Sequence, residues 1–232
     1  MIISANLKTN FTRKQTSEYI KELEIFMEQN SISQEVLLFP ATSSLDSYNG
    51  KITIGAQNAY PTKNGAFTGE IGTEQLDEFD IKTILIGHSE RRHILGETQK
   101  QIAEKFTYFK NLGYKIVYCV GEPLEKREAG EEEMLNYISS QYDGIDTQYD
   151  NLIIAYEPVW AIGTGLVPTL EDIAFIHKSL KEKSSAPLLY GGSVKVTNAK
   201  EILAVTNVDG ILVGSAALNV NNFIAMVEFA HQ

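Results

Sequence analysis

The sequence predicts one α/β domain, a single (β/α)₈ barrel that spans residues 1–232. The chain contains eight short apolar runs, and each is followed by a stretch with helical spacing or by a candidate for one. Strands that alternate with helices form parallel sheets, and eight such units in 232 residues fit a closed barrel better than two open sheets. No Pro- or Ser-rich linker divides the chain into parts.

The eight runs have the pattern of strands that are covered on both faces, because they are continuously apolar rather than alternating. In chain order they are residues 1–4, 36–39, 52–56, 83–86, 115–120, 152–155, 188–190 and 210–213. Pro40 closes the second run. Pro158 stops the sixth, because proline lacks a backbone N–H and makes the residue before it extended.

Helical spacing or composition marks the segments between the strands. The expected helices are residues 18–27, 74–79, 98–112, 122–140, 170–183, 199–205 and 223–230. Thr16 or Ser17 is the expected N-cap of the first helix, and Gly113 is a natural residue after the end of the third. Gly130 interrupts the strongly acidic stretch 122–140.

An open, doubly wound sheet is the alternative architecture. That fold is expected to carry a glycine-rich phosphate loop, G-x-G-x-x-G, after an early strand. No such motif follows the first apolar run. The barrel is therefore preferred, and it predicts that functional residues lie just after the strands.

Composition excludes several classes of partner. The net charge of -10 argues against a nucleic acid and against an anionic membrane surface, although it does not exclude a small anionic ligand. The single cysteine, Cys119, rules out an internal disulfide and is expected to be a small buried residue. No apolar run approaches the roughly 20 residues of a membrane span, and the start of the chain lacks the charge of a signal peptide. We therefore expect a soluble, cytoplasmic protein.

Four polar residues lie at the ends of predicted strands. Asn6 and Lys8 follow the first strand, His88 follows the fourth, and Glu157 ends the sixth. Taken singly, each has a simpler explanation, such as a solvated lysine, a structural histidine or a glutamate on an ordinary loop. A closed barrel, however, brings all four to one mouth.

These residue types suit acid–base chemistry. A glutamate that faces a histidine across a pocket offers a base and a polarising or proton-shuttling partner, and Lys8 can balance developing negative charge. Residues 87–92 are expected to turn into a helix with His88 near its positive end. A positive helix end disfavours the imidazolium, so His88 is expected to be neutral and to donate a hydrogen bond to a carbonyl or enediolate oxygen.

Two small-residue turns at the end of the chain suggest a phosphate site. Residues 190–193 (Tyr-Gly-Gly-Ser) follow the seventh strand, and Gly214 and Ser215 follow the eighth. Barrels often bind phosphate there through backbone N–H groups and a short helix N-terminus. Tight turns without a ligand are the alternative reading. The loop 158–165, which contains Gly163 and Gly165, is expected to act as a lid.

Several segments together resemble the triosephosphate isomerase family over essentially the whole chain. They are Asn-Leu-Lys at 6–8, Gln-Asn at 57–58, GAFTGE at 65–70, IGHSERR at 86–92, AYEPVWAIGTG at 155–165, YGGSV at 190–194 and DGILVGSAAL at 209–218. The resemblance implies a TIM barrel that interconverts dihydroxyacetone phosphate and glyceraldehyde 3-phosphate, in glycolysis and gluconeogenesis. It implies neither a metal nor a cofactor.

The resemblance also implies roles for individual residues. Glu157 is expected to remove the proton beside the carbonyl, and His88 to act as electrophile and proton shuttle. Lys8 and Asn6 are expected to bind substrate and to stabilise the enediolate. The residues expected to hold the phosphate are Gly163, Ser193, Gly214 and Ser215, and those expected to support the site from behind are Ser89 and Glu90. That a Glu base works with a neutral His under a closing loop is a property known for this family.

The family is typically a homodimer, so the resemblance implies a second copy as partner. The loop at 58–69 is expected to enter that copy, with Thr68 reaching toward its site. The loop 158–165 is expected to close over the reaction, which excludes water and hinders loss of phosphate from the intermediate.

The chain departs from the family pattern in a few places. Ala5 and Leu7 replace the usual Gly and Trp, and Ser215 stands where a second Gly is common. The lid ends in an unusual Leu-Val-Pro at 166–168, and Pro168 is expected to stiffen that hinge. Two other functions remain open: an aldolase-type barrel enzyme that forms a Schiff base on Lys8, and a non-catalytic barrel that only binds phosphate ligands.

Overall fold

Eight parallel strands form one sheet in the computed structural model, which describes residues 1–163 and 166–231. The strands are β1 (Ile2–Asn6), β2 (Glu35–Phe39), β3 (Thr53–Ile54), β4 (Thr83–Ile86), β5 (Lys115–Val120), β6 (Leu152–Tyr156), β7 (Leu188–Tyr190) and β8 (Gly210–Val213). They are ordered β3-β2-β1-β8-β7-β6-β5-β4. The two edges meet at a parallel bridge between Ala56 and Ile84, where the Ala56 N–H donates to Thr83 O at 2.9 Å. The predicted barrel is confirmed.

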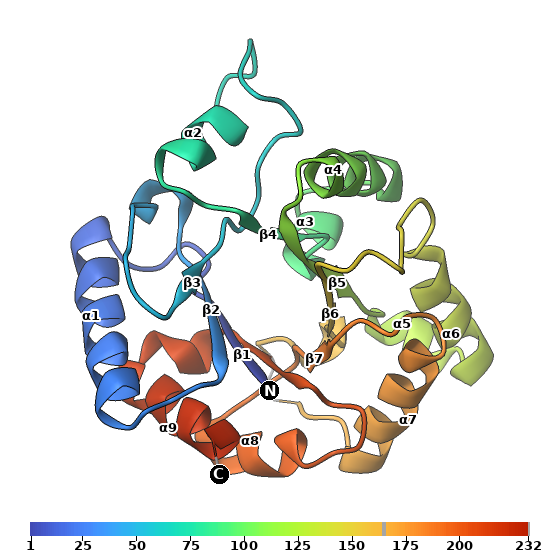
Figure 1. The fold of residues 1–232 in the computed structure, drawn as a ribbon. Coiled ribbons are helices and arrows are strands. Elements are labelled where there is room, and N and C mark those ends of the chain that lie inside the picture. Colours follow the sequence, from blue (N-terminus) through green and yellow to red (C-terminus); the bar gives the residue numbers. More distant parts are fainter. Residues whose placement is uncertain (164–165, 232) are drawn as a thin grey trace.

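The helices surround the strands as an outer ring (Figure 1). In the described residues they are α1 (Arg13–Gln29), α2 (Thr73–Glu78), α3 (Ser89–His93), α4 (Gln99–Asn111), α5 (Leu124–Glu128), α6 (Glu131–Ser140), α7 (Leu170–Lys181), α8 (Val196–Leu203) and α9 (Val220–His231), with 3₁₀ turns η1 (Thr42–Ser44), η2 (Val159–Ala161) and η3 (Ser215–Leu218). Within this part of the chain no helix has both the length and the apolar character needed to cross a membrane.

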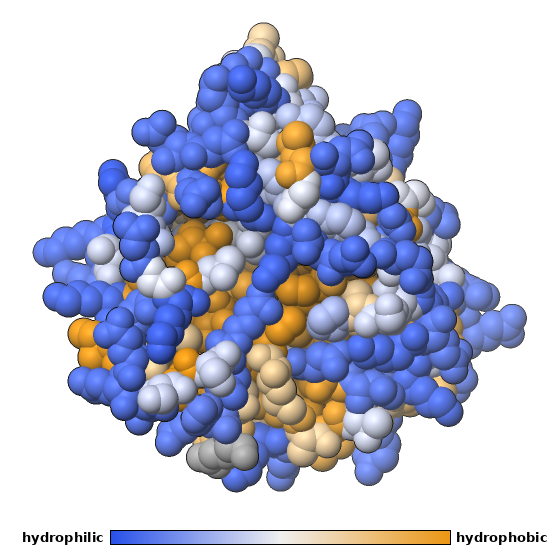
Figure 2. Space-filling view, viewed as in Figure 1, coloured by the Kyte–Doolittle hydropathy of each residue, from blue (hydrophilic) through white to orange (hydrophobic). Residues whose placement is uncertain are grey.

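The strands bury side chains on both of their faces. One face packs inside the barrel, and its buried residues are Ile2, Leu37, Phe39, Leu85, Val117, Cys119, Ile153, Ala155, Leu189 and Leu212. Their chain neighbours, such as Ile3 and Leu38, belong to the larger core under the helices. This double burial explains why the strands have no polar alternation. In space-filling form the middle of the same view is rich in apolar residues, with hydrophilic ones around it (Figure 2).

Local contacts and backbone geometry determine where two of the helices begin or end. The predicted N-cap of α1 was wrong: the cap is Thr12, because its side chain accepts from Gln15 N while the Gln15 side chain accepts from Thr12 N. This reciprocal capping box satisfies two N–H groups that have no partner in the helix, so α1 begins earlier than expected. The predicted interruption at Gly130 is confirmed, since its φ of 109° separates α5 from α6.

His177 is a fully buried titratable group in α7. Its Nδ1 lies 2.9 Å from Asn207 O, to which a protonated Nδ1 donates, and its ring meets Tyr156 nearly edge-on at 5.9 Å. Burial lowers the pKa of His177 from 6.5 to about 4. The folded protein therefore holds a neutral imidazole in its core.

This buried imidazole predicts an acid-sensitive stability. The unfolded chain takes up a proton at His177 below about pH 6.5, whereas the folded chain does so only near pH 4. Because the unfolded state binds this proton and the folded state does not, the contribution of His177 to the free energy of unfolding falls as the pH drops from 6.5 to 4, by about 3 kcal/mol. Urea unfolding at pH 7 and pH 4 measures the loss. His177→Gln is expected to lack this contribution, whereas exposed His231→Gln is expected to keep it; parallel pH profiles for wild type and His177→Gln would contradict the assignment.

Candidate active site

A cavity of about 350 Å³ lies where the strands end at their carboxyl termini. The residues that line it come from the carboxyl ends of β1 and β8 and from the segments after β1, β4, β6, β7 and β8. They include all of the predicted catalytic and phosphate-binding residues, namely Asn6, Lys8, His88, Glu157, Gly163, Ser193, Gly214 and Ser215. Barrel closure therefore brings together residues that are up to about 200 positions apart in the chain.

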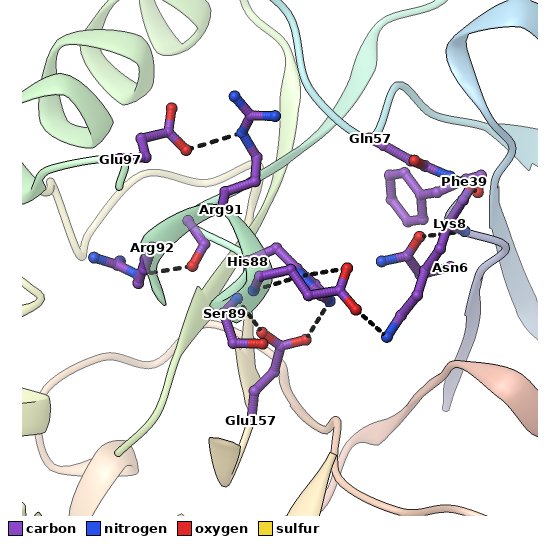
Figure 3. A network of polar contacts seen from close by, with 12 residues as sticks. Asn6, Lys8, Phe39, Gln57, His88, Ser89, Arg91, Arg92, Glu97 and Glu157 are labelled. Atoms are coloured by element: carbon purple, nitrogen blue, oxygen red, sulfur yellow. Dashed lines mark hydrogen bonds and ion pairs between the residues drawn. The ribbon is translucent and has the colours of Figure 1, made fainter. Parts of the chain in front are cut away.

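Glu157 is held at the end of β6 by its backbone and by its carboxylate. Its N–H donates to Val120 O at 2.7 Å, and Pro158 then ends the strand. The residue is only 2% exposed. One carboxylate oxygen, Oε1, lies 3.0 Å from His88 Nε2, and the other accepts from the Ser89 N–H at 3.0 Å (Figure 3). Both oxygens are thus held by groups that follow β4.

The pKa of Glu157 is set by opposing effects. Burial raises the pKa of Glu157, whereas His88, the Ser89 N–H and the nearby Lys8 lower it. The net result is a pKa below the usual value of 4.5. The carboxyl group is therefore ionised at neutral pH despite its burial. An ionised, buried carboxylate at the wall of a cavity is a suitable proton acceptor.

His88 is the N-cap of α3, so it lies at the positive end of a short helix as predicted. Its Nδ1 accepts from Glu90 N at 3.2 Å, which requires that Nδ1 carries no proton. The remaining proton is then on Nε2, which donates to Glu157. Burial lowers the pKa of His88, but the adjacent Glu157 carboxylate raises it, and the net shift is upward. The prediction of a neutral His88 rests on the helix end alone, and the direct contact with Glu157 opposes that effect.

Lys8 reaches the cavity from a turn with unusual backbone geometry. Its φ of 51° is in the left-handed region, and its N–H donates to Asn6 Oδ1 at 3.0 Å. The Gln57 side chain donates to Lys8 O at 2.8 Å and to Phe39 O at 2.9 Å, so it ties this turn to the end of β2. Lys8 Nζ then pairs with Glu90 Oε1 at 2.6 Å (Figure 3). The ammonium group therefore faces the same space as the Glu157–His88 pair.

Glycines allow close packing in the turns that line the cavity after β7 and β8. A Cβ on Gly191 would lie 3.0 Å from Glu157 Cγ, and one on Gly192 would lie 2.2 Å from the Tyr190 hydroxyl. Larger residues there would displace either the carboxylate or the tyrosine. Gly214 leads into η3, which begins at Ser215. Backbone N–H groups of such turns suit an anion.

The predicted lid is described from Pro158 to Gly163, and its last two residues, Thr164 and Gly165, lie outside the described residues. Its first part forms η2, and the Trp160 indole donates to Glu122 Oε1 at 2.9 Å. The Ser193 hydroxyl donates to Ala161 O at 2.5 Å, which links the lid to the turn after β7. Gly163 is exposed, with φ 70°.

Comparison with known proteins decides the family. A family model described as triosephosphate isomerase matches residues 1–230. The chain belongs to the triosephosphate isomerase family.

Curated triosephosphate isomerases from several bacteria are similar over nearly their full length. That of Sulfurimonas denitrificans is 69% identical over 230 residues, which are 99% of this chain and 96% of the relative. That of Sulfurovum sp. is 57% identical and covers 98% of this chain and 99% of the relative. That of Helicobacter pylori strain P12 is 47% identical, with 98% of each covered. The predicted membership of the triosephosphate isomerase family is confirmed.

Most of the residues that depart from the triosephosphate isomerase pattern lie away from the cavity. Ala5 and Leu7 are fully buried, where they fill the core beside the turn that carries Lys8. Leu166 and Val167, after the lid, are exposed by 55% and 40%, whereas Pro168 is buried. These residues do not line the cavity described above.

Sequence reasoning missed two residues that support this site. Gln57 was noted only as part of a matching motif, yet it anchors the turn of Lys8. Glu122 was read as part of a helix, yet its side chain is fully buried and accepts from Tyr156 and Trp160. Burial raises the pKa of Glu122, an effect that those two donors oppose. The one feature of the sequence that pointed to Glu122 as a site residue is its place two residues after the apolar fifth strand.

Proposed function

We propose that this chain interconverts dihydroxyacetone phosphate and D-glyceraldehyde 3-phosphate as an aldose–ketose isomerase, with Glu157 as the base. Membership of the triosephosphate isomerase family supports the reaction. The single observation that carries the residue assignment is the 3.0 Å contact between Glu157 Oε1 and His88 Nε2 in the wall of the cavity. These two groups can move one proton between the two carbon atoms of the substrate and another between its two oxygen atoms.

The proton transfers follow from this arrangement. Glu157 removes a proton from the carbon beside the carbonyl, and the electron pair moves onto the carbonyl oxygen to give an enediolate. His88 donates its Nε2–H to that oxygen and carries the proton between the two oxygens. Glu157 then returns its proton to the neighbouring carbon, which completes the isomerisation. Lys8 and Asn6 face the developing negative charge and stabilise it.

Substrate binding must separate the two acid–base groups, because no carbon atom fits between atoms that are 3.0 Å apart. The carboxylate therefore has to leave both His88 and the Ser89 N–H. Those are groups that hold its pKa down, whereas burial raises it. Once the carboxylate faces the substrate carbon, its pKa rises and it becomes a stronger base.

The phosphate group of the substrate belongs beside the small-residue turns that line the cavity after β7 and β8. We assign it to the turns that contain Ser193, Gly214 and Ser215, together with Gly163 of the lid. Backbone N–H groups there can donate to phosphate oxygens without a large side chain in the way. Ser89 and Glu90 act from outside the cavity, since one holds the Glu157 carboxylate and the other pairs with Lys8. Closure of the lid then excludes water from the enediolate.

A coupled assay of triose phosphate interconversion, with a chelator present, tests the function. We expect full turnover under these conditions. Borohydride treatment in the presence of substrate separates this function from the aldolase type: a covalent adduct on Lys8 would contradict the isomerase mechanism. Well-folded protein that binds inorganic phosphate but has no turnover would instead favour a non-catalytic binding protein.

We also infer a homodimer formed through the loop at 58–69. This segment, in teal before α2, projects away from the ring of helices (Figure 1). Near its tip Phe67 is 42% exposed and stacks on Tyr60 at 4.2 Å. A second cavity, of about 610 Å³, lies beside the site and is bordered by the exposed side chains of Ile94 and Leu95. An apolar loop tip of a second copy suits this hollow, and Thr68 then reaches toward the partner's site.

Sedimentation velocity tests this interface. We expect wild-type protein to sediment as a dimer and Phe67→Asp as a monomer, because a carboxylate at the loop tip cannot be buried without a partner. Leu112→Asp is a matched control, since Leu112 is 50% exposed at the end of α4, outside this loop and hollow. A wild-type monomer, or equal dissociation of both variants, would contradict the assignment.

We infer that the protein acts in the cytoplasm. Its single cysteine, Cys119, is buried as a thiol, and burial raises the pKa of that thiol well above its usual value. A protein without disulfides suits a reducing compartment. Fractionation of cells tests this directly: recovery of the protein outside the cytoplasmic fraction would contradict it.

A further inference from the structure

A chain of buried and partly buried hydrogen bonds lies behind the Glu157–His88 pair and joins the two strand ends that carry it. Its members are Arg92, Tyr118 and Gln141, none of which lines the cavity in the described part of the chain. We propose that these three are positioning residues that set the separation between His88 and Glu157. The proposal rests on the isomerase function proposed above.

Arg92 holds the turn that carries His88. Its Nε donates to Gly87 O at 2.7 Å, directly before His88, and its Nη2 donates to Cys119 O at 3.2 Å in β5. Gly87 has φ 78°, and a Cβ there would lie 2.8 Å from Arg92 Nη2. The planar guanidinium thus binds the end of β4 to the end of β5 in a geometry that a lysine ammonium cannot reproduce.

Tyr118 links Arg92 to Gln141 through its hydroxyl group. Its hydroxyl accepts from Arg92 Nη2 at 2.9 Å and donates to Gln141 O. The side chain is fully buried, and this burial raises the pKa of the phenol, so the hydroxyl keeps its proton at neutral pH. Gln99 supports the same junction, because its side chain accepts from Arg92 and donates to Gln141 O.

Gln141 completes the connection to Glu157. Its amide pairs with both backbone groups of Gly121: Oε1 accepts from the N–H at 2.8 Å, and Nε2 donates to the carbonyl at 2.9 Å. Gly121 in turn packs directly on the backbone of Glu157, since a Cβ there would lie 1.8 Å from the Glu157 carbonyl oxygen. The position of Gln141 therefore sets that of Gly121, and Gly121 limits where the Glu157 backbone can lie.

The network matters for catalysis because the acid–base pair spans two different strands. His88 follows β4 and Glu157 ends β6, and β5 lies between them. The network of Arg92, Tyr118 and Gln141 connects the end of β4 to the end of β6 by way of β5. Proton transfer is sensitive to small errors in donor–acceptor geometry, and a misplacement of 1 Å can cost about 10²-fold in rate. Removal of one hydrogen bond of this network is expected to lower kcat and to leave substrate binding unchanged.

Tyr118→Phe and Tyr149→Phe form the matched pair for the test. Each removes one phenol hydroxyl that donates to a backbone carbonyl, and Tyr149 donates to Tyr114 O at 2.8 Å, before the start of β5. We expect Tyr118→Phe to lower kcat on the order of 10-fold, with KM and inhibition by inorganic phosphate unchanged. The apparent pKa of the base in the pH profile of kcat/KM is expected to shift as well. Tyr149→Phe is expected to lose similar thermal stability but to keep wild-type kcat and pH profile.

The outcomes separate this proposal from the proposed function. Wild-type kcat and pH profile in Tyr118→Phe, or an equal loss in Tyr149→Phe, would overturn the network while leaving the isomerase assignment intact. An inactive wild-type enzyme would overturn both. If Tyr118→Phe does not fold, Arg92→Lys replaces it, because Arg92 is only partly buried and an ammonium group keeps the charge without reaching both Gly87 O and Cys119 O. It is expected to lower kcat without raising KM, and unchanged kcat overturns the proposal.

Discussion

Glu157→Gln is expected to lower kcat by at least about 10²–10⁴-fold, the range typical of a positioned general base. The amide has the size of the carboxylate but cannot accept the proton from carbon. Its oxygen can still accept the Ser89 N–H that now binds Oε2 at 3.0 Å, whereas its NH2 group cannot accept from His88 Nε2, so the variant loses that one contact. Steady-state kinetics in the coupled assay measure the loss, and titration with inorganic phosphate is expected to show unchanged binding.

A second substitution at this position separates the chemistry from the shape of the site. Glu157→Asp keeps a carboxylate but withdraws it by one methylene group, so its rate is expected to lie between those of wild type and Glu157→Gln. Full turnover by Glu157→Gln would refute the assignment of the base. Loss of phosphate binding in the same variant would show that the substitution disturbs the cavity as a whole.

His88→Asn is expected to lower kcat by about 10²–10⁴-fold, because it removes the group that polarises the carbonyl and moves the proton between oxygens. Asparagine is chosen because its Oδ1 can accept the Glu90 N–H in place of Nδ1 and so keep α3 capped. The atom that contacts Glu157 at 3.0 Å, Nε2, has no counterpart in the variant. Coupled kinetics measure the rate, and circular dichroism checks the fold.

The control for this change lies on the same short helix. His93 is exposed in the last turn of α3 and does not line the cavity, so His93→Asn is expected to keep wild-type turnover. If both variants lose activity equally, the loss in His88→Asn reflects damage to α3. Wild-type turnover in His88→Asn would remove His88 from the mechanism.

The barrel and its mouth could be predicted because they depend on local patterns. Eight continuous apolar runs mark strands that are buried on both faces, and parallel strands with right-handed connections place all carboxyl ends at one rim. Lys8, His88 and Glu157 follow three such runs, so their meeting needed no knowledge of side-chain contacts. The N-cap of α1 was missed because Thr12, Thr16 and Ser17 all precede the apolar spacing that begins at residue 19, and only the contact with Gln15 distinguishes Thr12.

The sequence by itself thus determined the family, the barrel and the residues around its mouth, because these follow from chain order, residue type and periodicity. Only the tertiary structure decided which of these groups touch. Glu157 contacts His88 across β5, Gln57 holds the turn of Lys8, and Gln141 reaches back to Gly121. Each contact joins segments that are 20 to 69 positions apart, and it exists only because the strand register and barrel closure bring them within hydrogen-bond distance. Charge states such as those of Glu157 and His88 depend on these contacts and on burial, which no local pattern encodes.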